Sequence, residues 1–140
     1  MSAENIAAFH RFHDAVESRD PETIAKVVEE TFHPDARFHT AEPGGVPAVP
    51  AQNRIWRVLF RAYPDLRVTI DELLAVDDKI VARQTVTGTN TGEYRGRPAS
   101  GRRVTYQEIF IARFDDGRIT DLWGVVDLYT QLSQLGHIRE

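Results

Sequence analysis

The sequence contains no cysteine, which excludes disulfides, thiolate metal ligands and a cysteine nucleophile. Its net charge of −4 and the lack of a dense basic cluster argue against nucleic acid as a partner. No apolar run is long enough for a signal peptide or a membrane helix, so we expect a soluble cytoplasmic protein that does not bind a membrane. We expect residues 1–140 to form a single domain, because this length supports one real core.

What the sequence does contain is a long alternation of apolar and polar residues from Arg102 to Val126. The alternation breaks at Asp115-Asp116-Gly117, which suits the positive φ angles of a tight turn, and then resumes. This pattern predicts a β-hairpin. One face of its first strand carries the row Val104, Tyr106, Glu108, Phe110, Ala112 and Phe114. Both faces are largely apolar, so we expect this strand to be covered on both sides.

Glu108 is the charged residue in that apolar row, and two interpretations of it are open. Strand twist could let its carboxylate reach solvent or a nearby arginine. Alternatively, the carboxylate lies in an apolar pocket, where loss of hydration would raise its pKa. A raised pKa would suit Glu108 to general acid or base catalysis.

Helical periodicity and capping residues predict helices at about 3–18, 21–31 and 51–62, and a short one from Asp127 to Gly136. The first predicted helix carries His10 and His13 with no further ligands evident, so we expect a solvated helix face and no metal site.

Strands are expected at about 36–39, 66–76 and 79–89, the last two joined by an acidic turn, and the glycine-containing segment 89–101 should be irregular. Helices followed by four antiparallel strands indicate an α+β fold. We therefore expect a curved antiparallel sheet with N-terminal helices, forming a cone-shaped α+β barrel around an apolar cavity.

Five segments together resemble one protein family: HPDARFH, AYPDLRV, TGTNTGEYRGRPASGRRV, IARFDDGRITDLW and QLSQLG. They are similar to the SnoaL-like polyketide cyclases, within the superfamily that shares the cone fold of nuclear transport factor and ketosteroid isomerase. The resemblance covers nearly the whole chain. It implies an apolar cavity in which an acid/base pair cyclises or tailors aromatic polyketides without a metal or an organic cofactor.

For the cyclases, the resemblance implies a His at the position of Phe110, an Asp at that of Gly124 and commonly a His at that of Asn90. Here none of these residues is ionisable, so the chain is nearer to the family's anthracycline hydroxylase members. Such a hydroxylase needs a base that draws a proton from an electron-rich phenol or hydroquinone, after which the substrate itself reduces dioxygen.

For this chemistry we expect Glu108 to be the catalytic base and Tyr106, on the same face, to donate a hydrogen bond to the substrate oxygen. Phe110 and Gly124 would contact the substrate. Asp121 is a third catalytic candidate, although alternation equally places it on the outer face of the sheet, opposite Gly124.

Weaker candidates for substrate binding lie outside the hairpin. Asn90 would orient the substrate or simply form a turn, and His39 would be a pocket group or a loop histidine. Asn53 and Trp56, on the third predicted helix, are candidates for the rim of the cavity.

On the outer face of the hairpin, Trp123 with Ile109 and Ile111 would form an apolar patch. Such a patch predicts a homodimer packed sheet to sheet.

Three functions stay open. The leading hypothesis is an enzyme that hydroxylates a polycyclic, anthracycline-type substrate. The second is a polyketide cyclase with a non-standard acid/base, Glu108 or Asp121. The third is a cone-fold protein that binds a ligand without catalysis.

Overall fold

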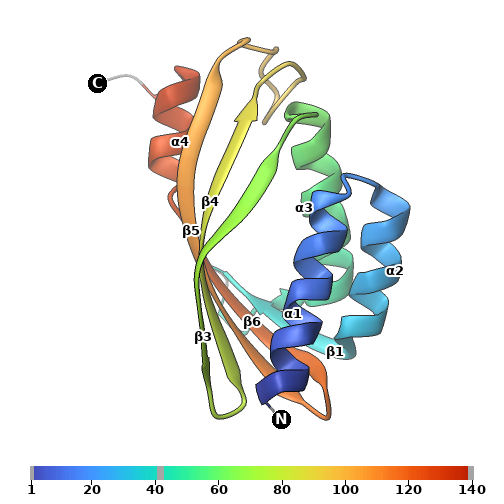
Figure 1. Cartoon of the computed structure of the whole chain (residues 1–140). Coiled ribbons are helices and arrows are strands. Elements are labelled where there is room, and N and C mark those ends of the chain that lie inside the picture. Colours follow the sequence, from blue (N-terminus) through green and yellow to red (C-terminus); the bar gives the residue numbers. More distant parts are fainter. Residues whose placement is uncertain (1, 41–42, 139–140) are drawn as a thin grey trace.

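The computed structural model describes residues 2–40 and 43–138, in which helices pack against a curved sheet (Figure 1). Along this part of the chain the elements are α1 Ser2–Glu17, α2 Pro21–Thr31, β1 Phe32–His39, β2 Val46–Pro47, α3 Ala48–Ala62, β3 Arg67–Val76, β4 Lys79–Thr89, β5 Arg103–Asp115, β6 Arg118–Val126 and α4 Leu128–Leu135. Within the described residues, none of the helices is both long and apolar enough to cross a bilayer.

The strands form one sheet in the order β2-β1-β6-β5-β4-β3. The predicted α+β class and the curved sheet are confirmed, but the sheet is mixed and not purely antiparallel, because β1 runs parallel to β6. This pairing joins segments far apart in the sequence, which alternation alone does not specify. The sheet also does not close into a barrel, since β2 and β3 lie at opposite ends of the order of described strands.

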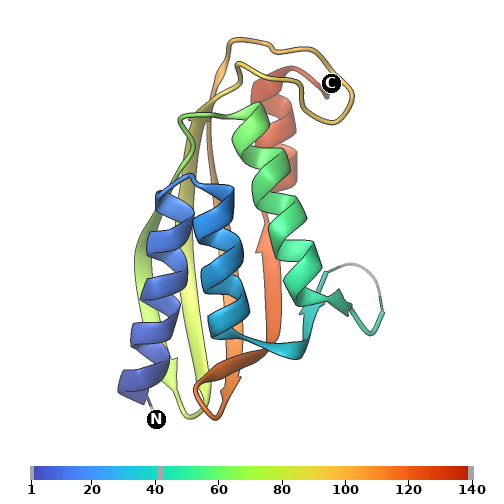
Figure 2. The same cartoon turned by 90° about the vertical axis from the view of Figure 1, so that its right-hand side faces the viewer.

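Helices α1, α2 and α3 lie side by side over one face of the sheet (Figure 2). Helix α2 begins as predicted, with Asp20 as N-cap accepting a hydrogen bond from the Glu22 amide at 3.3 Å and Pro21 in the first turn. Helix α3 begins at Ala48, slightly earlier than predicted. Strand β1 begins at Phe32, also earlier than the predicted start at about residue 36, because the chain becomes extended directly after α2.

The predicted hairpin is present as β5 and β6. Its turn residues Asp116 and Gly117 have φ angles of 52° and 78°, as a tight hairpin turn requires. The inner row of β5 is buried as predicted, apart from a half-buried Phe110. The outer face is not covered in the single chain, contrary to expectation, because α1, α2 and α3 all pack on the inner face.

Helix α4 runs beside the first half of β5, at the edge that β6 leaves open. The Gln134 side chain takes the place of a neighbouring strand there. Its Oε1 accepts a hydrogen bond from the Thr105 amide at 2.7 Å, and its Nε2 donates to the Thr105 carbonyl at 3.0 Å. Gly136 ends the helix in the left-handed region, with φ of 79°.

Candidate active site

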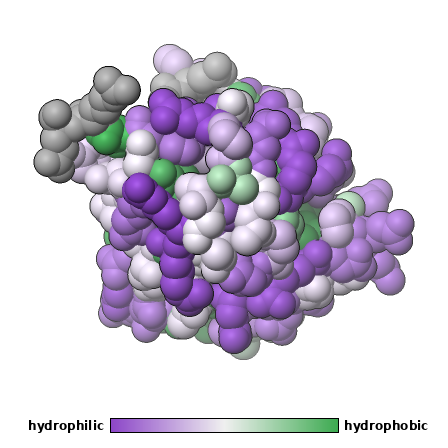
Figure 3. All heavy atoms as spheres, turned by 90° about the horizontal axis from the view of Figure 1, so that it is seen from above, coloured by the Kyte–Doolittle hydropathy of each residue, from purple (hydrophilic) through white to green (hydrophobic). Residues whose placement is uncertain are grey.

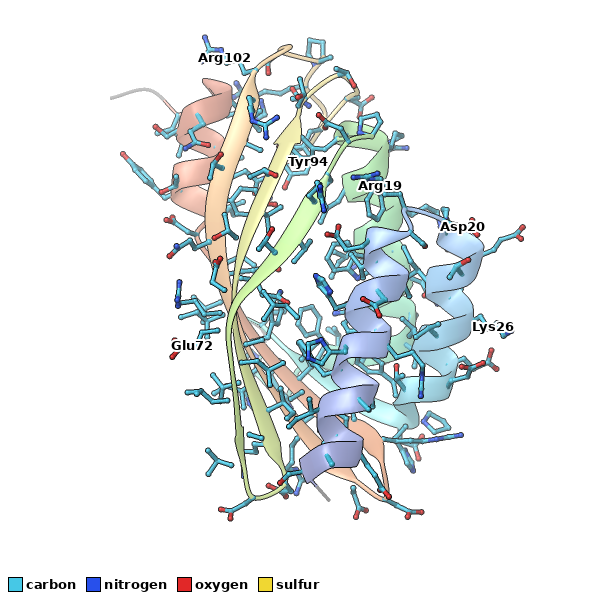
Figure 4. The ribbon with its side chains drawn as sticks, in the orientation of Figure 1. Arg19, Asp20, Lys26, Glu72, Tyr94 and Arg102 are labelled. Atoms are coloured by element: carbon cyan, nitrogen blue, oxygen red, sulfur yellow. The ribbon has the colours of Figure 1, made fainter. Side chains whose placement is uncertain are left out.

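A cavity of about 570 Å³ lies between the curved sheet and α3. Its walls come from β1, α3, β5, β6 and α4, and Tyr94 reaches it from the loop between β4 and β5 (Figure 4). Seen from the end at which this loop lies, the surface is mostly hydrophilic with small apolar areas (Figure 3). Five of the predicted site residues line the cavity: Trp56, Tyr106, Glu108, Phe110 and Gly124.

Glu108 is buried in the wall of this cavity, with 7 % of its surface exposed. The Gln84 side chain, directly opposite on β4, donates a hydrogen bond from Nε2 to Oε1 of Glu108 at 2.9 Å. Burial raises the pKa of Glu108 to about 7, and the Gln84 hydrogen bond opposes this rise only in part. The carboxyl therefore exchanges its proton near neutral pH, as a general acid or base does.

Tyr106 lies two residues before Glu108 on the same face of β5 and is also buried. Burial raises the pKa of its hydroxyl well above the ordinary value, and the negative charge of Glu108 adds to the rise. The phenol therefore keeps its proton at neutral pH. It can donate a hydrogen bond to an oxygen of a molecule in the cavity.

Phe110 and Gly124 lie opposite each other on β5 and β6. A Cβ atom built on Gly124 would be 2.3 Å from Cε1 of Phe110, so the ring occupies the space that a side chain at position 124 would need. This part of the wall is apolar, and no ionisable pair bridges the two strands at this point of the described cavity.

Asp121 and His39 lie on the outer face of the sheet and do not line the cavity. His39 Nε2 is 2.9 Å from Asp121 Oδ1, while Arg113 and Thr120 donate hydrogen bonds to Asp121 Oδ2. Partial burial works to raise the pKa of Asp121, but these three partners together hold it below the ordinary value. The His39 ring stacks on Trp123, with ring centroids 4.9 Å apart.

Asn90 and Asn53 also lie outside the described cavity lining. The Asn90 side chain fixes the loop between β4 and β5. Its Oδ1 accepts from the Ser100 amide at 2.8 Å, and its Nδ2 donates to the Gly92 carbonyl at 2.8 Å. These bonds match the turn interpretation of Asn90. Asn53 is on α3 beside two residues that do line the cavity, Gln52 and Arg54.

The sequence analysis missed three buried polar residues in or beside the cavity wall, whose positions follow from periodicity. Gln84 continues the inward row of β4, which runs through Ile80, Ala82 and Val86. Gln52 lies one helical turn before Trp56 and accepts a hydrogen bond from its indole Nε1 at 3.0 Å. Gln131 on α4 donates to the buried Tyr63 hydroxyl at 2.9 Å.

Within the described residues, no group of three or more His, Asp or Glu side chains is placed to hold a metal ion. His13, one of the two histidines on α1, instead has Nε2 2.6 Å from the Val68 carbonyl oxygen. The described part of the chain thus forms an apolar cavity with a titrating carboxyl and a protonated phenol in its wall.

A curved sheet covered on one face by three helices, with a cavity between them, defines an α+β cone fold. The family model of the SnoaL-like polyketide cyclases matches residues 7–135, and the chain belongs to this family. Among the curated proteins, none matches this chain.

Solved structures agree with this family. AclR from Streptomyces galilaeus, a candidate hydroxylase, is 26% identical, with a TM-score of 0.87 over 100% of this chain and 85% of that chain. TsrD from Streptomyces laurentii is 29% identical, with a TM-score of 0.84 over 99% of this chain and 98% of that one. IdmH from Streptomyces antibioticus, a candidate polyketide cyclase, is 27% identical, with a TM-score of 0.78 over 94% and 98% of the two chains.

Proposed function

We propose that this protein is an enzyme that hydroxylates a polycyclic aromatic polyketide of the anthracycline type, using dioxygen and no metal or organic cofactor. The observation that carries the proposal is the buried Glu108 carboxyl, whose pKa of about 7 suits a general base, in the wall of an apolar cavity. A volume of about 570 Å³ is within the usual range of small-molecule sites. The likeness to AclR, a candidate hydroxylase, supports this reaction class.

In the proposed reaction, ionised Glu108 takes a proton from a phenolic hydroxyl of a reduced, hydroquinone-type substrate. Tyr106 donates a hydrogen bond to the oxygen on which negative charge develops. The electron-rich ring carbon then reduces dioxygen and forms a carbon–oxygen bond. The resulting peroxide loses water, so that hydroquinone and dioxygen yield the hydroxylated quinone and one water. A reductive step must therefore supply the substrate.

The second candidate is ring closure by aldol condensation, which membership of the cyclase family favours. In this chain the position opposite Phe110 is Gly124, and the ring fills the space beside it. A cyclase of this sequence would therefore use Glu108, and not a pair across these two residues, to move the proton.

Anaerobic and aerobic incubation with a reduced anthraquinone-type polyketide, followed by mass spectrometry, separates these functions. We expect the quinone product to gain one oxygen atom in air and not under nitrogen. Loss of water in both atmospheres would instead establish a cyclase. Tight binding without turnover in either atmosphere would establish a non-catalytic ligand-binding protein and contradict both enzymatic proposals.

We also propose that the protein is a homodimer packed through the outer face of the sheet. A row of apolar side chains crosses four neighbouring strands on this face: Leu74 on β3, Val81 on β4, Ile111 on β5 and Trp123 on β6. Ile109 extends this apolar stripe and is 46% exposed in the single chain. A self-complementary stripe of this kind suits a twofold axis.

Light scattering coupled to size-exclusion chromatography tests the dimer. The wild type should have twice the mass of the chain at micromolar concentration. Ile111→Glu should be monomeric, because its cross-strand neighbours Val81 and Trp123 offer no partner to a charge buried between the sheets. The matched control is Thr105→Glu on the same face of β5, near α4 and outside the stripe. A monomeric wild type would contradict the proposal.

A further inference from the structure

Behind the wall of the cavity, a second and much smaller void of about 20 Å³ lies between α1 and the inner face of the sheet. Three side chains, those of Gln52, Trp56 and Phe110, belong to the lining of both spaces. Gln84, whose amide holds Glu108, also lines the void. The void is therefore adjacent to the cavity and to the partner of the proposed base.

The size of the void admits a diatomic molecule or a single water. A void must offer about 10–15 Å³ to the centre of a water-sized sphere before it can hold one, and this void offers about 20 Å³. A substrate ring does not fit into such a space. The occupant must therefore be very small.

The chemistry of the walls favours an apolar occupant. Most of the lining is hydrocarbon from α1, α3 and the sheet, namely Phe9, Phe12, Val16, Val68 and Leu122 together with the two shared aromatic rings. Three hydrogen bonds already occupy polar atoms at the void: Gln84 Nε2 donates to Glu108, Gln52 Oε1 accepts from Trp56, and His13 Nε2 is paired with the Val68 carbonyl. A buried water typically makes about three hydrogen bonds, whereas voids lined by hydrocarbon stay dry and take up apolar atoms such as xenon.

We infer that this void is the binding site for dioxygen in the hydroxylation, an inference that rests on the proposed function. Dioxygen is small and apolar, and the reaction consumes it. One of its oxygen atoms forms the new carbon–oxygen bond and the other leaves as water, while the hydroquinone is oxidised to the quinone. The Phe110 and Trp56 rings line both spaces and therefore lie between dioxygen and the substrate.

Xenon binding tests the site without any turnover. In methyl NMR spectra of the ligand-free protein under xenon pressure, we expect shifts at Val16, Val68 and Leu122, which line the void. Val28 is buried on α2, a helix that lines neither the void nor the cavity, and should not shift. Absence of xenon shifts at the lining methyl groups would overturn the inference, as would an ordered water in the void of a crystal structure.

A kinetic experiment tests the role of the void. Val68→Leu and Val16→Leu each add a methylene that fills it, and Val28→Leu on α2 is the matched control that adds the same group elsewhere in the core. We expect the void-filling variants to raise KM for dioxygen about tenfold with an unchanged Kd for the polyketide, measured anaerobically. Using two filling variants guards against the failure of one to fold, which thermal melts would reveal.

The outcomes distinguish the two proposals. If the wild type consumes oxygen with the reduced polyketide but folded filling variants keep the wild-type KM for dioxygen, the void is not the oxygen site and the proposed function stands. If the wild type consumes no oxygen, the proposed function fails and the assignment of the void fails with it. An equal rise in KM for Val28→Leu would also overturn the assignment, because a general loosening of the core would then explain the effect.

Discussion

The β5–β6 hairpin carries two acidic side chains whose environments differ sharply. Glu108 points inward, is buried and has a neutral amide, Gln84, as its hydrogen-bond partner. Asp121 points outward and is bonded by His39, Arg113 and Thr120. The pKa of Glu108 is raised to about 7, whereas that of Asp121 is lowered.

The difference teaches that the face of a strand, and not the residue type, decides what a carboxylate can do. On the outer face, the Arg113 guanidinium and hydrogen bonds from His39 and Thr120 stabilise the ionised form, so Asp121 stays charged and ties β1, β5 and β6 together. On the inner face, a neutral amide leaves much of the cost of burying a charge uncompensated. Glu108 can therefore gain or lose a proton near neutral pH, which Asp121 cannot.

The largest expected effect comes from removing each carboxylate in turn. Glu108→Gln should lower kcat of the proposed hydroxylation by about 10²–10⁴-fold, the usual contribution of a general base. Asp121→Asn is the matched control and should keep kcat close to that of the wild type, since Asp121 does not line the cavity. Steady-state kinetics of the two folded variants measures both effects. Loss of activity in Asp121→Asn but not in Glu108→Gln would contradict the proposed role of Glu108.

The second prediction concerns stability against pH. The folded-state pKa of Glu108, about 7, lies above its ordinary value of 4.5, so the folded protein binds this proton more tightly than the unfolded chain does. The contribution to stability is complete below pH 4.5 and is lost as pH rises to about 7. Its total is on the order of 3 kcal/mol.

Urea denaturation at a series of pH values measures this loss. The free energy of unfolding of Glu108→Gln, subtracted from that of the wild type, isolates the contribution of Glu108 from those of the other titrating groups. The free energy of unfolding of the wild type, relative to that of Glu108→Gln, should fall as the pH rises from 4.5 to about 7. A flat difference would mean that Glu108 is not desolvated in solution.

A third and smaller effect is expected at Gly124, which makes the inner face apolar beside Glu108. The Cβ atom of Gly124→Ala would overlap Cε1 of Phe110 at 2.3 Å, so we expect a loss of stability. Overpacking of this kind typically costs about 1–3 kcal/mol. The double variant with Phe110→Leu should recover most of the loss, and chemical denaturation of all three variants measures it. If Gly124→Ala alone is as stable as the wild type, the Phe110 ring does not exclude a side chain at position 124.

The smallest predicted effect sharpens the account of Glu108 itself. Gln84→Met keeps the size of the side chain but removes the hydrogen bond that favours the ionised carboxylate, so the pKa of Glu108 should rise further. Activity at pH 7 should fall by roughly tenfold and return at higher pH. Gln107→Met, on the outer face of β5, is the control and should leave the pH profile unchanged. An unshifted profile for Gln84→Met would show that the amide does not tune the pKa of Glu108.

Much of the fold and part of the site follow from periodicity alone. Alternation along β5 predicts which side chains point inward, and the burial of Tyr106 and Glu108 agrees with it. The same rule applied to β1 would have placed His39 outward, because Phe38 before it points into the core. Similarly, Gln84 stands in an inward row and could have been identified as a partner of Glu108.

What the sequence does not reveal depends on contacts between distant segments. The parallel pairing of β1 with β6 brings His39 onto Trp123, and no local pattern specifies this register. Asn90 is held by a network within its own loop, which depends on the path of the chain around it. The size of the cavity and the void behind it are set by packing across the whole domain, because small differences between side chains decide whether space is filled.

The contact between Phe110 and Gly124 also makes the two positions depend on each other in any redesign of this wall. Because the ring occupies the space beside Gly124, a side chain at position 124 requires the Phe110 ring to move or to be replaced by a smaller residue. The two positions are therefore coupled, and the effects of substitutions at 110 and 124 on stability should not add. Any group introduced at 124 into this wall of the cavity is best combined with a smaller residue at 110.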